Sequence, residues 1–131
     1  MTGVILAAHG TMAFSALELA EMLTGEKERV ECIGFQAGDS LENLLERFQA
    51  AIDALGTENG ILILTDLKGG SPCNAATLMQ KTRENIRTVY GFSIPMLLQA
   101  FEGREETDDL DELAEGVLEV GAFAMGKISF S

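Results

Sequence analysis

The sequence is poor in the residues that metal sites require. Its 131 residues include one histidine, two cysteines and no tryptophan. Structural zinc sites take four cysteine or histidine ligands at short, characteristic spacings. Cys32 and Cys73 are 41 positions apart and have a single histidine to complement them. The sequence therefore predicts no metal site, and nothing in it calls for a cofactor.

Basic residues and long apolar runs are also scarce. The chain has 9 Lys and Arg against 21 Asp and Glu, a net charge of -12, which repels nucleic acid and anionic membranes and makes both poor partners. No apolar run approaches the roughly 20 residues that span a bilayer. The first three residues lack the basic start of a signal peptide. We therefore expect a cytoplasmic protein, folded as one domain over residues 1–131.

Short apolar segments alternate with helical patterns along the chain. The helix-terminating and turn-forming residues between them are mostly glycines. Asp39 followed by Glu42 indicates a capping box, and Ser71-Pro72 indicates an N-cap followed by proline at the first helical position. The predicted strands are 3–8, 30–35, 60–65, 86–92 and a short final one at 126–130, and the predicted helices are 13–24, 40–55, 72–81, 96–101 and 108–123.

This alternation predicts an α/β fold, a doubly wound, mostly parallel sheet with helices on both faces. The commonest small arrangement gives the strand order 2-1-3-4, which leaves a crevice between the loops after strands 1 and 3. The short C-terminal strand has two explanations. It is an antiparallel edge on its own sheet, or an edge strand exchanged with a second subunit in a dimer.

The loops after strands 1 and 3 carry the candidate chemistry. His9, the only histidine, ends the first strand and precedes Gly10. Its imidazole is a good nucleophile near neutral pH, and Asp66 is the carboxylate that could fix its tautomer. Gly69 and Gly70, together with Ser71 at a helix start, could form an anion-binding loop. The alternatives are an ordinary loop histidine and a plain turn with a helix cap.

These segments resemble the enzyme IIA components of the mannose-type sugar phosphotransferase system. The resemblance covers most of the chain in the right order, and the Asp-x-x-Gly-Gly-Ser-Pro-x-Asn motif that begins at Asp66 is its most specific part. Lys68, Cys73 and Phe92-Ser93 depart from the usual family pattern. The other matching stretches are 4–10, 20–25 and 91–98.

The resemblance implies a phosphorelay. His9 would accept a phosphoryl group on Nε2 from the phosphorylated carrier protein HPr and pass it to an enzyme IIB, while Asp66 orients the ring through Nδ1. Gly10, Gly70 and Ser71 would bind the phosphoryl group. The resemblance further implies a homodimer with an exchanged edge strand, and membrane permease subunits that act only indirectly on this chain.

Three other interpretations stay open at this point. A hydrolase would use Cys73 or Ser71 with His9 and Asp66, although no G-x-S-x-G elbow is present. A regulatory or binding module would use the same histidine only as a signal. A relative of the dihydroxyacetone kinase phosphotransfer subunit would share the early histidine, but that family generally lacks the Gly-Gly-Ser-Pro-x-Asn stretch.

Overall fold

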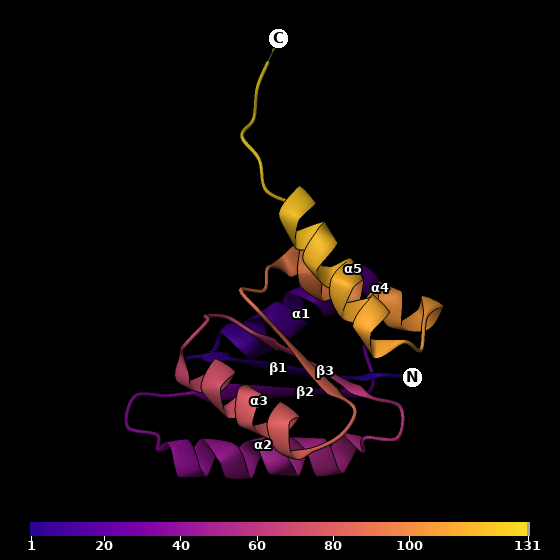
Figure 1. The fold of residues 1–131 in the computed structure, drawn as a ribbon. Helices are drawn as coiled ribbons and strands as arrows, with labels where there is room; N and C mark the ends of the chain where they lie inside the picture. The colour runs from indigo at the N-terminus through magenta and orange to yellow at the C-terminus, as the bar shows by residue number, and fades with distance from the viewer. Residues whose placement is uncertain (131) are drawn as a thin grey trace.

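The computed structural model describes residues 1–130, which form four strands and five helices (Figure 1). Strands and helices alternate up to α4, and α5 follows α4 directly, as the sequence predicts. The elements are β1 (Gly3–His9), α1 (Met12–Thr24), β2 (Val30–Phe35), α2 (Leu41–Leu55), β3 (Ile61–Thr65), α3 (Ser71–Thr82), β4 (Ile86–Tyr90), α4 (Ile94–Glu106) and α5 (Leu110–Phe123).

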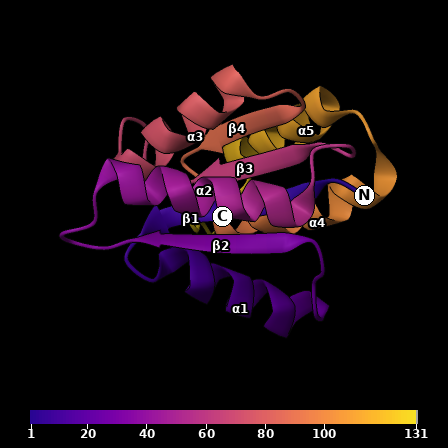
Figure 2. The same ribbon diagram turned by 90° about the horizontal axis from the view of Figure 1, so that it is seen from below.

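The four strands form one parallel sheet in the order β2-β1-β3-β4, which confirms the predicted topology (Figure 2). β1 is central, and its register places His9 opposite Phe35 on β2 and Ala7 opposite Thr65 on β3. Residues 9 and 66 therefore leave the same edge of the sheet on neighbouring strands. Parallel strands deliver their carboxyl ends to one edge, and this is where open α/β sheets bind ligands.

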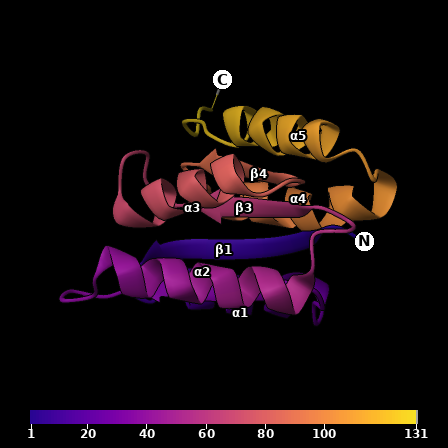
Figure 3. The same cartoon turned by 60° about the horizontal axis from the view of Figure 1, so that its bottom comes forward.

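Helices cover both faces of the sheet. α1, α4 and α5 lie on one face and α2 and α3 on the other (Figures 1 and 3). Successive side chains of β1 enter opposite cores, because side chains alternate along a strand. Val4 and Leu6 pack in the core under α1, α4 and α5, and Ile5 packs with α2 and α3. This two-sided burial explains why β1 is apolar from Val4 to Ala8 and β3 from Ile61 to Leu64.

Two predicted helix caps are wrong in detail. Ser40, not Asp39, caps α2, and its hydroxyl accepts a hydrogen bond from the Asn43 N–H at 3.0 Å. The Asp39 carboxylate instead accepts from the Arg47 guanidinium at 2.9 Å. α3 begins one residue earlier than predicted, because Gly70 takes the N-cap position that the sequence pattern assigned to the serine.

The C-terminal third differs most from the prediction. α4 continues to Glu106 instead of ending near residue 101, because Gly103 packs against Leu113 of α5, where a side chain would clash. The predicted strand at 126–130 does not form on this chain's own sheet, and these residues have no regular secondary structure. Figure 1 shows this segment leaving the end of α5 and pointing away from the sheet.

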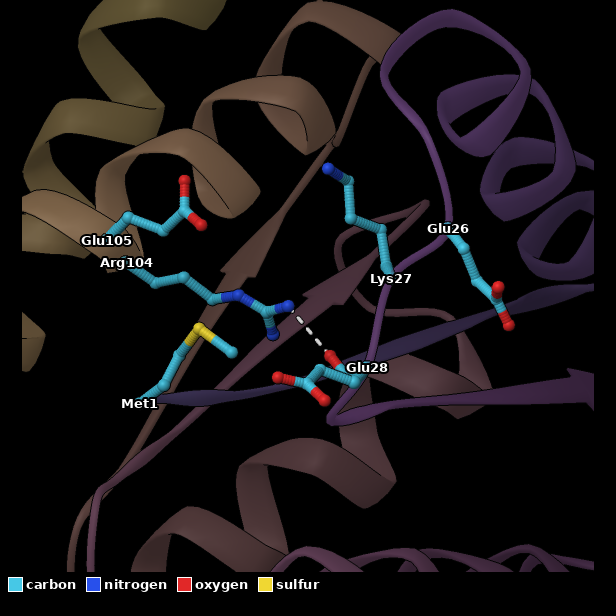
Figure 4. A pocket seen from close by; sticks show the side chains of 6 residues that line it. All are labelled: Met1, Glu26, Lys27, Glu28, Arg104 and Glu105. Carbon is cyan, nitrogen blue, oxygen red and sulfur yellow. Dashed lines mark hydrogen bonds between the residues drawn. The ribbon is translucent and has the colours of Figure 1, made fainter.

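The amino edge of the sheet is closed by a buried arginine. Arg104, 4% exposed, donates hydrogen bonds to the carbonyls of Thr2, Glu28 and Arg29, which precede β1 and β2. Its guanidinium also lies 4.9 Å from the centre of the Phe101 ring. Figure 4 shows the Arg104 side chain reaching the Glu28 carbonyl across a cavity of about 360 Å³. One cation thus joins α4 to the starts of two strands.

We predict that Arg104→Met lowers the free energy of unfolding by about 3 kcal/mol, because three backbone carbonyls lose a charged donor that water cannot fully replace. Urea denaturation followed by circular dichroism measures the change. Arg87→Met is the matched control. Arg87 pairs with Asp111 at 2.7 Å, but both side chains are exposed, so we expect a loss under about 1 kcal/mol. Equal losses in the two variants would contradict the assignment.

Candidate functional site

His9 ends β1 at the carboxyl edge of the sheet, with its side chain 44% exposed. The chain turns at Gly10, whose φ of 62° lies in the left-handed region that favours glycine. Its N–H donates to the carbonyl of Phe35 on the neighbouring strand at 2.9 Å. α1 begins two residues later, so the histidine stands directly before a helix N-terminus.

Asp66 follows β3 and binds both the backbone and the ring of His9. Its Oδ2 accepts a hydrogen bond from the His9 backbone N–H at 3.0 Å and lies 2.9 Å from Nδ1 of the ring. An ionised carboxylate can only accept, so Nδ1 carries the proton and Nε2 keeps a free lone pair. The histidine and the aspartate that the sequence singled out are therefore in direct contact.

The environment of Asp66 favours its charged form. Burial alone would raise its pKa, but the hydrogen bonds from the His9 backbone and ring outweigh burial and lower the pKa below its ordinary value of 3.8. The carboxylate is therefore charged at neutral pH. It can hold the ring tautomer and stabilise positive charge that develops on the imidazole.

Gly70 brings the backbone of the next loop against the imidazole. A Cβ at this position would lie 2.8 Å from Cε1 and 3.5 Å from Nε2 of His9. The φ of Gly70 is -74°, which any residue can adopt, so the requirement for glycine here is space. Gly69 before it has a φ of 80° and makes the turn. The start of α3 therefore lies beside the free ring nitrogen.

Among the five helices of residues 1–130, the two that start at this site are the two without a capping side chain. α2, α4 and α5 are capped by Ser40, Ser93 and Asp109, whereas α1 and α3 have no side-chain cap. The first backbone N–H groups of α1 and α3 are therefore left without a capping acceptor. Both helix N-termini can donate to a bound anion and favour negative charge through the helix dipole.

Ser71 is the first residue of α3 and is half-buried. Its position beside Gly70 places its hydroxyl among the candidate phosphoryl-binding groups. Cys73, in the same helical turn, is 7% exposed. Within residues 1–130, the imidazole hydrogen bond is made through Nδ1, and no nucleophile is bonded to Nε2. The hydrolase interpretation needs a nucleophile at that nitrogen, so the geometry does not favour it.

Sequence reasoning missed three residues at the end of β2. The Phe35 ring lies 5.9 Å from the imidazole centre at an interplanar angle of 87°. The Gln36 side-chain amide donates to the Gly10 carbonyl at 3.1 Å. A Cβ at Gly34 would lie 2.5 Å from that same carbonyl oxygen. The register between β1 and β2 brings them here, and no motif in the sequence marks them.

One hollow in the surface lies beside the site, and another lies at the opposite edge of the sheet. A groove of about 420 Å³ runs from Lys68 along α3 to Tyr90 on β4, and the Lys68 ammonium lies 5.4 Å from the centre of the Tyr90 ring. The cavity in Figure 4 lies at the opposite edge of the sheet. His9 lines neither. Within residues 1–130, no three or more metal-ligating side chains gather, and no helix is long and apolar enough to cross a membrane.

The fold and the site together define a parallel α/β domain with one histidine, held by an aspartate, at the switch point of its sheet. Residues 3–118 match the family model EIIA-man, described as the PTS system fructose IIA component. The chain belongs to this family of phosphotransferase system components. The expected family and fold are both confirmed.

Similar proteins carry the names of the same system. The chain is 37% identical over 118 residues to the PTS system mannose-specific EIIAB component of Escherichia coli K12, covering 90% of this chain and 36% of that protein. It is 29% identical over 105 residues to the PTS system fructose-specific EIIA component of Bacillus subtilis, covering 80% and 72%. The chain thus spans about a third of the length of its EIIAB relatives.

Solved structures show the same fold. The phosphotransferase system component EIIA from Streptococcus agalactiae superposes with a TM-score of 0.90 at 27% identity, covering 97% of both chains. The mannose/sorbose specific IIA subunit from Enterococcus faecalis gives a TM-score of 0.89 at 30% identity, covering 99% of this chain and 96% of that one.

We predict that the Asp66 carboxyl titrates with a midpoint below 3.8, as followed by its side-chain ¹³C NMR signal. Because the pKa is lowered in the folded state, the contribution of Asp66 to stability is fully present above the unfolded pKa of about 3.9. It is lost as pH falls through the folded pKa. The part of the stability difference between wild type and Asp66→Asn that depends on the Asp66 charge should therefore be present at pH 5 and be lost in strong acid. A midpoint at or above 3.8 would contradict this account.

Proposed function

We propose that this chain is a phosphocarrier of the sugar phosphotransferase system. His9 accepts a phosphoryl group from phospho-HPr and passes it to an enzyme IIB during sugar uptake, in the cytoplasm. One observation carries the proposal: Asp66 binds Nδ1 of the only histidine and leaves Nε2 free beside Gly70 and the start of α3. Membership of a family of phosphotransferase system components supports it.

The proposed step exchanges one phosphorus–nitrogen bond for another. The Nε2 lone pair attacks the phosphorus of the phosphorylated donor, the bond from phosphorus to the donor breaks, and the electron pair returns to the donor. The Nδ1 proton stays in its hydrogen bond to Asp66, which offsets the positive charge that the ring acquires. In the second transfer, a nucleophile of enzyme IIB attacks the phosphorus and the bond from phosphorus to Nε2 breaks. His9 is then free to accept another phosphoryl group.

The groups around Nε2 can stabilise the negative charge of the phosphoryl group during transfer. The transferred group carries negative charge on three oxygens, and preorganised donors stabilise such charge with little reorganisation. The uncapped N-termini of α1 and α3 supply backbone N–H groups near Gly10 and Gly70, and Ser71 adds a hydroxyl. Positioning and backbone electrostatics are the contributions that phosphoryl transfer requires from a protein.

The exposure of the nucleophile fits a macromolecular donor. The His9 side chain is 44% exposed and lines neither of the hollows described above. A partner protein can therefore bring its own phosphorylated side chain to the ring. The sugar itself would be recognised by membrane subunits, which this chain serves only indirectly through enzyme IIB.

We also propose that the chain is a homodimer whose C-terminal segment pairs with a second copy. The end of α5 and the segment after it carry exposed apolar side chains: Phe123, Met125, Ile128 and Phe130 are 78–95% exposed. Within residues 1–130, the edge strand β4 pairs with β3 alone. At the other edge, Arg47 donates a hydrogen bond to one carbonyl of β2, that of Gly34. An added strand on β4 would bury the apolar tail.

The phosphocarrier proposal predicts one acid-labile phosphate per wild-type chain after incubation with phosphoenolpyruvate, enzyme I and HPr. Intact-protein mass spectrometry measures it. His9→Ala should accept none, because the nucleophile is gone. Asp66→Asn should fold and accept phosphate on the order of a hundredfold more slowly, because the ring loses its charged orienting partner.

Two controls make this experiment decisive. Circular dichroism confirms that each variant is folded, and a second incubation with enzyme IIB tests whether phosphate leaves wild type. Phosphate on His9→Ala would contradict the mechanism. A wild-type protein that is phosphorylated but never passes the group on would favour the regulatory module instead.

The dimer proposal predicts that removal of residues 125–131 yields a monomer, while the full chain sediments as a dimer at micromolar concentration in analytical ultracentrifugation. The reason is that the exposed apolar segment supplies the exchanged strand. Lys127→Ala in the full chain is the control, because it keeps the apolar side chains, and it should stay dimeric. A monomeric full chain, or a truncated chain that still dimerises, would contradict the exchange.

A further inference from the structure

The end of β2 contacts the nucleophilic turn at three points. The Phe35 ring stands perpendicular to the imidazole at 5.9 Å, and the Phe35 carbonyl accepts from the Gly10 N–H at 2.9 Å. The Gln36 amide donates to the Gly10 carbonyl at 3.1 Å. Gly10 is therefore held through both of its backbone polar groups. All of these contacts come from the strand opposite to the one that supplies Asp66.

Asp66 alone does not fix the orientation of the imidazole plane. Its Oδ2 binds Nδ1 and the backbone N–H, which sets the side-chain direction and the tautomer. A hydrogen bond tolerates a range of angles, so the ring can still librate about its Cβ–Cγ bond while the bond to Oδ2 persists. In-line transfer requires the Nε2 lone pair to point at the phosphorus, because reacting orbitals must be aligned. A second contact on the ring would narrow this libration.

The Phe35 ring is placed to restrict it. Perpendicular aromatic pairs with centres 4.5–7 Å apart are a preferred arrangement, and this pair lies within that range. Gly70 bounds the ring near Cε1, where a Cβ would lie 2.8 Å away. The imidazole is thus held by Asp66 through Nδ1, by Phe35 from β2 and by the backbone of Gly70.

Gly34 shows how closely this arrangement is packed. An added Cβ would lie 2.5 Å from the Gly10 carbonyl oxygen and 3.1 Å from the Phe14 ring. The turn after His9 can therefore rest on β2 only because position 34 has no side chain. With the carbonyl resting there, the Gln36 amide reaches it, and the first N–H groups of α1 keep a constant position relative to the ring.

We infer that Phe35 and Gln36 are positioning residues for phosphoryl transfer by His9. Phe35 sets the plane of the imidazole, and Gln36 holds the Gly10 carbonyl and with it the turn into α1. This inference rests on the proposed function of His9. It adds a role for β2, the strand whose residues carry no sequence motif, and it assigns no contact with HPr or enzyme IIB to either residue.

Transfer kinetics separate positioning from docking. The rate of phosphate uptake is measured at varied phospho-HPr concentration for Phe35→Leu, Phe35→Tyr and Gln36→Ala. We expect Phe35→Leu to lower kcat about tenfold with KM for phospho-HPr unchanged. Phe35→Tyr, which keeps the ring, should restore kcat. Gln36→Ala should lower kcat about fivefold, the equivalent of one neutral hydrogen bond.

Matched controls lie near the site and away from it. Phe14→Leu removes an exposed phenylalanine whose ring lies beside Gly34 instead of the imidazole. Gln49→Ala removes a glutamine of α2 that binds Asp53. Both should keep the wild-type kcat. If Phe14→Leu lowers kcat as much as Phe35→Leu does, loss of a general apolar contact explains the effect and the inference fails.

NMR of the imidazole gives a readout that needs no phosphoryl donor. The chain has one histidine, so its labelled ring signals are unambiguous. We expect Phe35→Leu to increase ring motion in ¹³C relaxation while the Nδ1-protonated tautomer persists, because Asp66 is intact. A rigid ring together with a wild-type kcat in Phe35→Leu would overturn the inference. A wild type that accepts no phosphate would instead overturn the proposed function, and this inference with it.

Discussion

A single carboxylate oxygen organises the site. Oδ2 of Asp66 accepts hydrogen bonds from the backbone and the ring of His9, so the end of β3 fixes the end of β1 through two bonds to one atom. That arrangement requires the two strands to be neighbours and their carboxyl ends to be level, which the parallel order β2-β1-β3-β4 provides. The tautomer, the free lone pair on Nε2 and the lowered pKa of Asp66 all follow from it. The fold thus sets the orientation and tautomer of His9 through one acceptor atom, Oδ2 of Asp66.

Most of the fold and the central pair of the site could be predicted from the sequence. Apolar runs gave the strands, and the switch-point rule for parallel sheets placed His9 beside Asp66. The predictions that were wrong depended on contacts between segments distant in the sequence. The length of α4 depends on how Gly103 packs on α5, and residues 126–130, predicted as a strand, form none on the chain's own sheet. Phe35 and Gln36 were missed because register, which local sequence does not encode, brings β2 to the histidine.

The two edges of the sheet are stabilised by different means. At the amino edge, the buried Arg104 donates hydrogen bonds to three carbonyls just before β1 and β2. At the carboxyl edge, the helices α1 and α3 start without capping side chains, so polar backbone groups face solvent or a ligand. The contacts of Arg104 and the candidate site of His9 therefore lie at opposite ends of the strands. Under the phosphocarrier function proposed above, this arrangement leaves the edge that carries His9 open to partner proteins.

The three glycines around the histidine differ in what they would tolerate. Gly10 and Gly69 have positive φ angles but open space where a side chain would stand, so asparagine, which adopts left-handed backbone at modest cost, is an admissible replacement at either. Gly70 has an ordinary φ and little space, so alanine there would push the imidazole out of its position. In a library of random variants selected for a folded protein, positions 10 and 69 would therefore accept a narrow set of residues chosen by backbone conformation. Position 70 would be restricted by its contact with the His9 ring, a steric reason that its dihedral angles do not reveal.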